Sequence, residues 1–170
     1  MKYFLLFACL GLFLVFGFNQ SAEAFKDIDL KEVQIQAEKG DPAAQTRLGV
    51  AYSTGINVEK DKNKAAEWYR KAAEQGYASG QWNLAFLYIR GEGVEPDDKK
   101  ARELFQKAAE QEFPPAEYDL GIMYLNGFGG KRSRAEALEW LQKSADHGYR
   151  EAISFLKSRG EYKEKGADKT

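Results

Sequence analysis

The stretch from residue 76 to residue 111 reads GYASGQWNLAFLYIRGEGVEPDDKKARELFQKAAEQ, and it decides the fold because the chain repeats it. Shifted by 36 positions, it aligns without insertion or deletion on residues 40–75, GDPAAQTRLGVAYSTGINVEKDKNKAAEWYRKAAEQ, and on residues 112–147, EFPPAEYDLGIMYLNGFGGKRSRAEALEWLQKSADH. Each copy has small residues first, then an aromatic run, a glycine-containing loop and an alanine-rich basic run. The chain therefore contains three copies of one unit, at 40–75, 76–111 and 112–147.

Each unit divides into two stretches with the periodicity of a helix. The first helices are predicted over 42–53, 78–89 and 114–125, and the second helices over about 62–75, 98–111 and 134–147. One face of every first helix repeats a small residue, a leucine and a tyrosine, so we expect this face to be core, including Tyr52, Tyr88 and Tyr124. A unit of this size cannot bury its apolar face alone, and stacked units can, which predicts an all-α solenoid.

Residues that end one helix and cap the next recur between the two helices of each unit. Gly55, Gly91 and Gly127 follow the first helices, where a residue with positive φ ends a helix at little cost. Asp61, Asp97 and Ser133 precede the second helices, where their side chains are predicted to cap the free backbone N–H groups. The second helices end at Gly76, Glu112 and Gly148, so Glu112 breaks the glycine pattern.

Partial units flank the three complete ones. Residues 25–39 match the end of a second helix and residues 148–160 match the start of a first helix, and both are predicted to be capping helices that cover the ends of the stack. Residues 161–170 are polar and are predicted to form a disordered tail.

The N-terminus has the pattern of a secretory signal peptide. Lys2 precedes an uncharged apolar run over 4–18, and Ala22-Glu23-Ala24 supplies a small-x-small cleavage site, so residues 1–24 are expected to be removed. An uncleaved membrane anchor is the alternative, although the run is shorter than the roughly 20 apolar residues that span a bilayer. After cleavage no membrane span is expected, and the protein would be periplasmic or secreted.

The composition of the chain provides few candidate catalytic or metal-binding side chains. The chain has a net charge of −1 with acids and bases interleaved, which favours neither nucleic acid nor an anionic membrane as a partner. Cys9 is the only cysteine and lies in the signal segment, so disulfides and thiolate metal sites are not expected in the mature chain. His147 is the only histidine and is expected to be an exposed helix-capping residue. We therefore predict no catalytic residue, no metal site and no cofactor.

The repeated motifs identify a family. The L-G-x-x-Y run, the G-x-x-V loop, the capping Asp, the W-Y/L-F pair and the A-A-E-x-G ending, all in register, resemble the Sel-1-like repeat, a relative of the tetratricopeptide repeat. The resemblance covers about 27–160 and implies a right-handed superhelical solenoid of antiparallel helix pairs. It further implies a protein-binding scaffold, often exported from bacteria and not generally enzymatic. Some cysteine-rich relatives are linked to cell-wall or β-lactam compounds, and this chain lacks those cysteines.

By analogy with tetratricopeptide repeats, one side of the first helices lines a concave face. At those positions the second and third units carry an apolar and aromatic stripe with polar neighbours, and we predict a partner-binding site at Trp82, Phe86, Ile89, Arg90, Tyr118, Ile122, Leu125 and Asn126. Asn83 and Asp119 lie beside it. The alternative is that Trp82, Phe86 and Tyr118 serve as packing between neighbouring helices.

Three functions follow from these observations. The first is an exported, non-enzymatic scaffold that binds a protein or peptide on its concave face. The second is a cell-envelope accessory protein or enzyme that binds peptidoglycan fragments or β-lactams. The third is a structural oligomer whose concave face is filled by its own tail or by another copy. The sequence leaves the oligomeric state open.

Overall fold

The computed structural model describes residues 29–164 of the chain. This part is all-helical, as predicted, with eight helices and no strand. The helices are α2 (Leu30–Glu38), α3 (Pro42–Thr54), α4 (Lys62–Glu74), α5 (Ala78–Arg90), α6 (Asp98–Ala109), α7 (Pro114–Asn126), α8 (Arg134–Asp146) and α9 (Arg150–Ser158).

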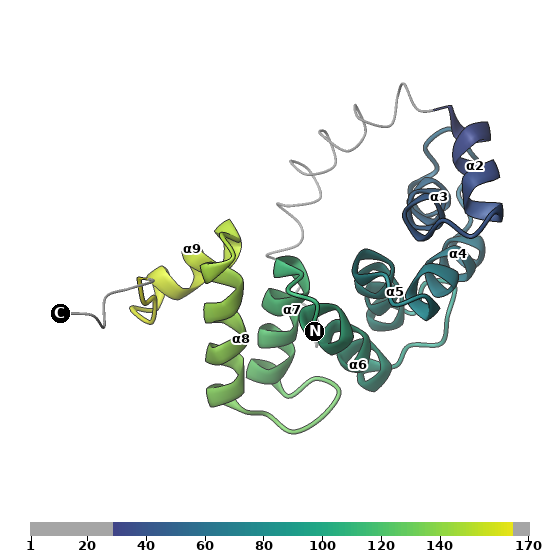
Figure 1. The fold of residues 1–170 in the computed structure, drawn as a ribbon. Coiled ribbons are helices and arrows are strands. Elements are labelled where there is room, and N and C mark those ends of the chain that lie inside the picture. The colour runs from purple at the N-terminus through teal and green to yellow at the C-terminus, as the bar shows by residue number, and fades with distance from the viewer. Residues whose placement is uncertain (1–28, 165–170) are drawn as a thin grey trace.

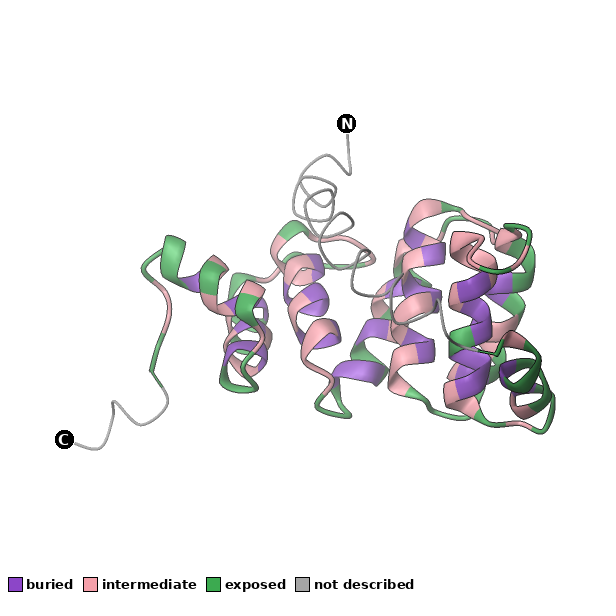
Figure 2. Cartoon of the chain, turned by 90° about the horizontal axis from the view of Figure 1, so that it is seen from above, coloured by how far each residue is buried: buried purple, intermediate pink, exposed green. Residues whose placement is uncertain are grey.

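The helices form a solenoid. Each helix packs mainly against the helices before and after it in sequence, and the described chain curves into an arc (Figure 1). The first helices of the units, α3, α5 and α7, line the inside of the arc, and α4 and α6 lie outside. Buried residues concentrate where successive helices face one another (Figure 2). The inside of the arc is therefore built from equivalent positions of successive units.

The predicted helix ends are confirmed. Gly55, which ends α3, has a φ of 82°, and the equivalent Gly91 and Gly127 are also left-handed. One carboxylate oxygen of Asp61 accepts hydrogen bonds from the backbone N–H groups of Asn63 and Lys64, and Asp97 caps α6 in the same way. These caps satisfy donors that the first turn of a helix leaves unpaired.

Small residues set the spacing between the two helices of a unit. A Cβ added at Gly49 would lie 2.6 Å from the ring of Tyr69, and one at Gly121 would lie 2.7 Å from Cγ of Leu141. Tyr69 and Leu141 are both buried, so neither has room to withdraw. The repeated small residue in the first helix therefore allows the second helix to pack closely.

A second set of glycines sets the spacing between units. Gly93, in the loop of the second unit, approaches the carbonyl oxygen of Lys62 so closely that an added Cβ would overlap it. Gly129 has the same relationship to the carbonyl oxygen of Asp98. Both glycines are left-handed, as is the equivalent Asn57, with φ of 61°. The loops of the second and third units thus rest on the start of the preceding unit's second helix.

The three repeated tyrosines are less buried than predicted. Tyr52, Tyr88 and Tyr124 pack against the core but remain partly exposed. A cation from a second helix lies near each ring. Lys64 and Lys100, from the same unit as the tyrosine, lie 5.3 Å from the centroid of Tyr52 and 5.4 Å from that of Tyr88. Arg102, from the preceding unit, lies 3.7 Å from the centroid of Tyr124. The tyrosines form the edge of the core, where an aromatic ring meets a solvated charge.

Both partial units contain the predicted helix, in a shorter form. Helix α2 buries Val33 and Ala37, and α9 buries Ala152 and Leu156. In α9, Lys157 occupies the position at which the complete units carry Gly49, Ala85 and Gly121.

The segment after α9 was predicted to be disordered from residue 161. Residues 161–164 instead fold back on α8. The side chain of Gln142 makes two hydrogen bonds with the backbone of Lys163, and Tyr162 packs beside the apolar cluster of α8 and α9. The remainder of the predicted tail lies outside the described residues.

The predicted signal peptide, residues 1–24, also lies outside the described residues. Within the described part, none of the helices has the length and apolar character needed to cross a membrane.

Candidate functional site

A hydrogen bond between two units lies at the centre of the predicted site. The indole Nε1 of Trp82, on α5, donates to Oδ2 of Asp119, on α7, at 2.7 Å. Asp119 is 8% exposed and Trp82 is half-buried. The bond joins the first helices of the second and third units directly, along the inside of the arc.

Trp82 also belongs to an aromatic cluster. Its ring meets that of Phe86 edge to face at a centroid distance of 4.8 Å, and Phe86 meets the buried ring of Phe105 at 5.2 Å. The guanidinium of Arg90 lies 5.6 Å from the centroid of Phe86. Trp82 and Phe86 therefore do two things: they cover the core of the second unit, and they leave part of their rings exposed.

A second aromatic cluster joins the third unit to the C-terminal cap. The ring of Tyr118, on α7, lies 5.7 Å from that of Tyr149 and 6.1 Å from that of Phe155. Ile122 packs against the same apolar cluster, and all four side chains are half-buried. Half-buried aromatic side chains thus occur on α5, on α7 and at α9.

The remaining predicted residues differ in exposure. Ile89 is 6% exposed and lies in the core cluster with Leu120 and Met123, so it offers almost no surface to a partner. Leu125 is half-buried, and Asn126 is exposed with its amide donating to the carbonyl of Ile122 at 2.8 Å. We use "inner face" for the exposed parts of the predicted set without Ile89, that is, Trp82, Phe86, Arg90, Tyr118, Ile122, Leu125 and Asn126. Asp119 is buried and is left out for the same reason as Ile89.

The carboxyl group of Asp119 is electrostatically unusual. Its pKa is raised to about 7, mainly by burial; the hydrogen bond from Trp82 opposes this rise, and the negative charge of Glu151 adds to it. Glu151 lies in the first turn of α9. A buried acid with a pKa near neutral is therefore hydrogen-bonded to Trp82 of the inner face.

Sequence reasoning did not include the residues that α9 contributes. The signal was available, because a shift of 36 places Glu151 on Pro115 and Phe155 on Asp119, both first-helix positions of the third unit on the concave side. Residues 148–160 were predicted only to cap the stack, so the contribution of α9 beside the inner face was not predicted.

A polar pair repeats at the end of each unit. Nε2 of Gln75 donates to Oε1 of Gln45 at 2.8 Å, and Gln111 donates to Gln81 at 2.9 Å. In the third unit the same positions hold His147 and Glu117.

There, Nδ1 of His147 lies 2.9 Å from Oε2 of Glu117, which is 1% exposed. Burial raises the pKa of Glu117, and the contact with His147 lowers it. The prediction that His147 caps a helix and is exposed is confirmed, since it is the C-cap of α8, but the pairing with Glu117 was not predicted.

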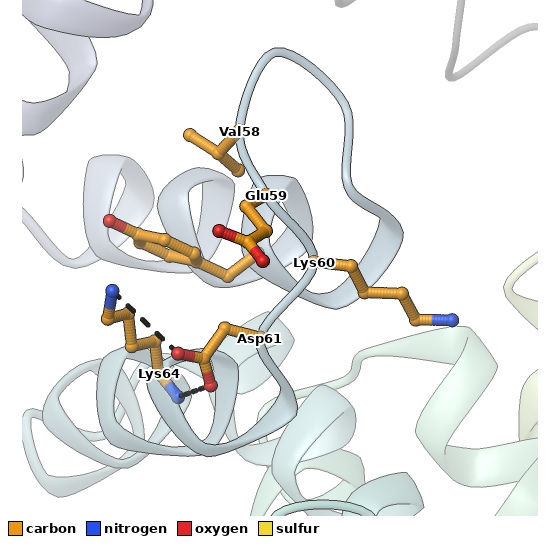
Figure 3. Close-up of a pocket in the computed structure, with 6 residues that line it drawn as sticks. Val58, Glu59, Lys60, Asp61 and Lys64 are labelled. Atoms are coloured by element: carbon orange, nitrogen blue, oxygen red, sulfur yellow. Dashed lines mark hydrogen bonds and ion pairs between the residues drawn. The ribbon is translucent and has the colours of Figure 1, made fainter.

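A shallow pocket lies elsewhere, between the loop after α3 and the start of α4 (Figure 3). It is lined by Tyr52, Val58, Glu59, Lys60, Asp61 and Lys64. Asp61 caps α4, and Lys64 lies 3.7 Å from its carboxylate and above the ring of Tyr52. The polar groups that face one another here hold the helix start in place.

Two acidic residues in the loop between α5 and α6, Glu92 and Asp97, also have structural partners. Glu92 pairs with Lys62 at 2.6 Å, and Asp97 caps α6. Within residues 29–164, no group of three histidine, cysteine, aspartate or glutamate side chains is arranged to hold a metal ion.

The geometry of stacked helix pairs agrees with comparison to known proteins. The Sel1 repeat profile matches residues 42–77, 78–113 and 114–149, which together make up most of the chain. The chain therefore belongs to the Sel1 repeat family, whose members are typically protein–protein interaction scaffolds and whose fold is generally non-catalytic. Proteins of this family are often extracellular or periplasmic.

Solved structures give the same result. A Sel1 repeat protein from Oxalobacter formigenes is 38% identical, with a TM-score of 0.66 over 72% of this chain and 50% of that one. The protective antigen c5321 of uropathogenic Escherichia coli, described as displaying an SLR fold, is 34% identical, with a TM-score of 0.72 over 79% of this chain. The present chain spans half the length of the first protein and 29% of the second.

A more distant structure supports the fold alone. Helicobacter pylori cysteine rich protein B is 20% identical, with a TM-score of 0.59, and the match covers 76% of this chain and 98% of that one. No curated protein matched this sequence significantly.

Proposed function

We propose that this protein is an exported scaffold that binds an extended segment of a protein partner on its inner face. The observation that carries the proposal is a pair of half-buried aromatic clusters at equivalent positions of successive first helices, Trp82 with Phe86 on α5 and Tyr118 with Phe155 on α7 and α9. Rings held in place by packing lose little entropy on binding and bury a large area, as binding surfaces require.

The variation between units supports this assignment. The positions that set the scaffold repeat the same residue types, such as Leu48, Leu84 and Leu120, and these are buried. The position of Trp82 instead holds Thr46 and Tyr118 in the other units, and that of Phe86 holds Val50 and Ile122. Packing of the repeat therefore does not require the particular side chains found on the inner face.

Export is the second half of the proposal, and it rests on the charge, apolar run and small-x-small site of residues 1–24. N-terminal sequencing of the protein recovered from cells tests it directly. A mature chain that begins at or near Phe25 is expected, and an intact Met1 on protein recovered from the cytoplasm would contradict export. No contact within the described residues favours the peptidoglycan or β-lactam alternative.

Site-specific photo-crosslinking in living cells tests the binding face. A photoreactive amino acid at Leu125 is expected to capture a partner, because this side chain is half-buried on the inner face and belongs to none of the buried clusters. The matched control places the same amino acid at exposed Glu103 on α6, outside the arc.

A partner captured from position 125 and absent from position 103 supports the proposal. Equal capture from both positions, or capture from position 103 alone, contradicts it. Truncation of Phe86 is a poor test, because its ring packs on Phe105 and its loss would cost about 3–5 kcal/mol of stability.

A further inference from the structure

The segment after α9 makes the contact by which a complete unit rests on the unit before it. In the second unit, Glu92 in the loop after α5 pairs with Lys62, the first residue of α4. In the C-terminal segment, Glu161 pairs with Arg134, which is the first residue of α8 and the repeat equivalent of Lys62. The segment therefore lies on α8 as the loop of a following unit would.

The backbone turn that makes this contact is also shared. Gly91 ends α5 with a φ of 64°, and Gly160 follows α9 with a φ of 65°. In both places a glutamate comes directly after the left-handed glycine. Because α9 has 9 residues and α5 has 13, the turn comes earlier in the C-terminal half-unit and still brings its glutamate to the same place.

Three further contacts hold the segment on the last two helices. Nε2 of Gln142 donates to the carbonyl oxygen of Lys163 at 2.9 Å, and the backbone N–H of Lys163 donates back to Oε1 of Gln142 at 3.2 Å. Tyr162 packs in the same apolar cluster as Leu138 of α8. The ammonium group of Lys157, on α9, lies 5.1 Å from the centroid of the Tyr162 ring.

Tyr162 replaces a side chain that α9 lacks. Ala66 on α4, the repeat equivalent of Leu138, is buried in a cluster that includes Leu87 of the following first helix. The residue of α9 at the boundary position equivalent to Leu87 is Arg159, whose guanidinium lies over the ring of Phe155 instead. The apolar cover of α8 that a leucine would give therefore comes from Tyr162.

Helix α9 has little else to hold it in place. It buries Ala152 and Leu156, whereas α7, the preceding first helix, buries six residues. Within residues 29–164 no second helix packs on its other side. Its 9 residues are also fewer than the roughly 12–15 at which an isolated helix becomes stable in water. A helix with so few buried contacts opens locally at a lower free energy than the core does.

The position of α9 decides whether the second aromatic cluster exists. The rings of Tyr149, at the start of α9, and Phe155, within it, lie 5.7 and 6.1 Å from that of Tyr118 on α7. If α9 leaves α8, Tyr118 loses both of these neighbours at once.

From these contacts we infer that residues 161–164 are a strap that keeps α9 docked and thereby controls whether the aromatic cluster of Tyr118, Tyr149 and Phe155 is assembled. The docking of α9 does not depend on the proposed function, and the consequence for binding rests on it. Displacing the strap weakens partner binding although the strap contains no residue of the inner face. The strap is therefore a regulatory element of the proposed binding surface.

Hydrogen exchange followed by mass spectrometry tests the strap without a partner. The double variant Gln142→Ala/Tyr162→Ala is compared with the wild type, and Gln142→Ala alone serves as a second variant that removes the two bonds to Lys163 and leaves the ring in place. The matched control is Gln106→Ala, because Gln106 is the repeat equivalent of Gln142 on α6 and bonds to Glu110 at the end of the same helix.

The amides of α9 are expected to exchange about tenfold faster or more in the double variant, and less than that in Gln142→Ala. The amides of α5 should exchange at the wild-type rate in every variant, and Gln106→Ala should leave α9 unchanged.

Photo-crosslinking from position 125 then tests the consequence for binding. The photoreactive amino acid is placed at Leu125 in the wild type, in Gln142→Ala/Tyr162→Ala and in Gln106→Ala. Capture of the partner is expected to fall severalfold in the double variant and to remain at the wild-type level in the control.

The two measurements separate the strap from the proposed function. Unchanged exchange in α9 overturns the strap and leaves the proposed function standing. Exchange that accelerates equally in α5 and α9 also overturns it, because α9 then does not open by itself. Faster exchange in α9 with undiminished capture overturns the control of binding. A wild type that captures no partner contradicts the proposed function, and the exchange rates still decide whether the strap holds α9.

Discussion

The Nδ1 atom of His147 lies 2.9 Å from Oε2 of Glu117, in the place where the two preceding units have a hydrogen bond between glutamines. The third unit thus uses a titratable pair where the repeat elsewhere uses a neutral one. Glu117 is buried and His147 is exposed, so losing the contact should cost more free energy when the buried carboxylate is left without its partner than when the exposed imidazole is.

Replacing both residues by glutamine should restore the neutral pair. At neutral pH, His147→Gln alone is expected to lower the free energy of unfolding by about 1–3 kcal/mol, because it leaves a buried carboxylate with a weaker partner. The double variant Glu117→Gln/His147→Gln should recover most of that loss. Urea unfolding of the two single variants and the double variant measures the coupling, and additive effects would show that the contact has no energetic weight.

Asp119 should make stability depend on pH. Its folded-state pKa of about 7 is above that of an unfolded aspartate, so the folded state holds a proton that the unfolded state has lost. The resulting stabilisation is fully present below pH 4 and is lost as pH rises through about 7. Asp119→Asn is therefore expected to unfold at higher denaturant than the wild type at pH 8, with a smaller difference at pH 4.

The comparison needs only urea midpoints at several pH values. Glu103→Gln, which changes an exposed carboxylate on α6, is the control. A wild type and an Asp119→Asn variant whose stabilities change in parallel between pH 4 and pH 8 would contradict the prediction.

The contact between units at Gly93 can be separated from the conformational preference of glycine. Gly76 and Gly93 both have positive φ, but a Cβ at Gly76 meets nothing within 4 Å, whereas one at Gly93 overlaps the carbonyl oxygen of Lys62. Gly76→Ala is expected to cost about 1–2 kcal/mol from backbone strain. Gly93→Ala should cost about 1–3 kcal/mol more from the overlap. Thermal melts of both variants check this, and equal losses would mean that the loop can move away.

Glu112 offers a stabilising change. It has a φ of 56° at the position where Gly76 and Gly148 end the other second helices, and a side chain with a Cβ is strained there. Glu112→Gly should raise the free energy of unfolding by about 0.5–1 kcal/mol. The control is Glu110→Gly, since Glu110 is right-handed and gains nothing from the change. If Glu112→Gly melts at or below the wild-type temperature, backbone strain is not what limits this turn.

Local signals explain why the helices could be predicted so closely. The capping aspartates and left-handed glycines act within a few residues, so a single unit already marks its own helix ends, and the fixed period confirms them three times. The burial of individual inner-face residues could not be predicted in this way. Ile89 is buried because the helices of the next unit cover it, while the equivalent Leu125 has only a partial unit after it and remains half-buried.

The same limit applies to charges. Nothing in the segment around Asp119 indicates that Trp82, 37 residues earlier, donates to it or that Glu151 acts on its pKa. These relationships arise from the curvature that brings first helices together, and curvature is a property of the stack rather than of any unit.

Lys157 occupies the position at which Gly49, Ala85 and Gly121 let a second helix dock. In the first and third units this position lets the second helix approach so closely that an added Cβ would overlap Tyr69 or Leu141. Lys157 instead lies 5.1 Å from the ring of Tyr162, on the segment that folds back. A helix packed on α9 as α8 packs on α7 would have to displace this side chain, so the surface of α9 at Lys157 differs in steric character from the same surface of the complete units.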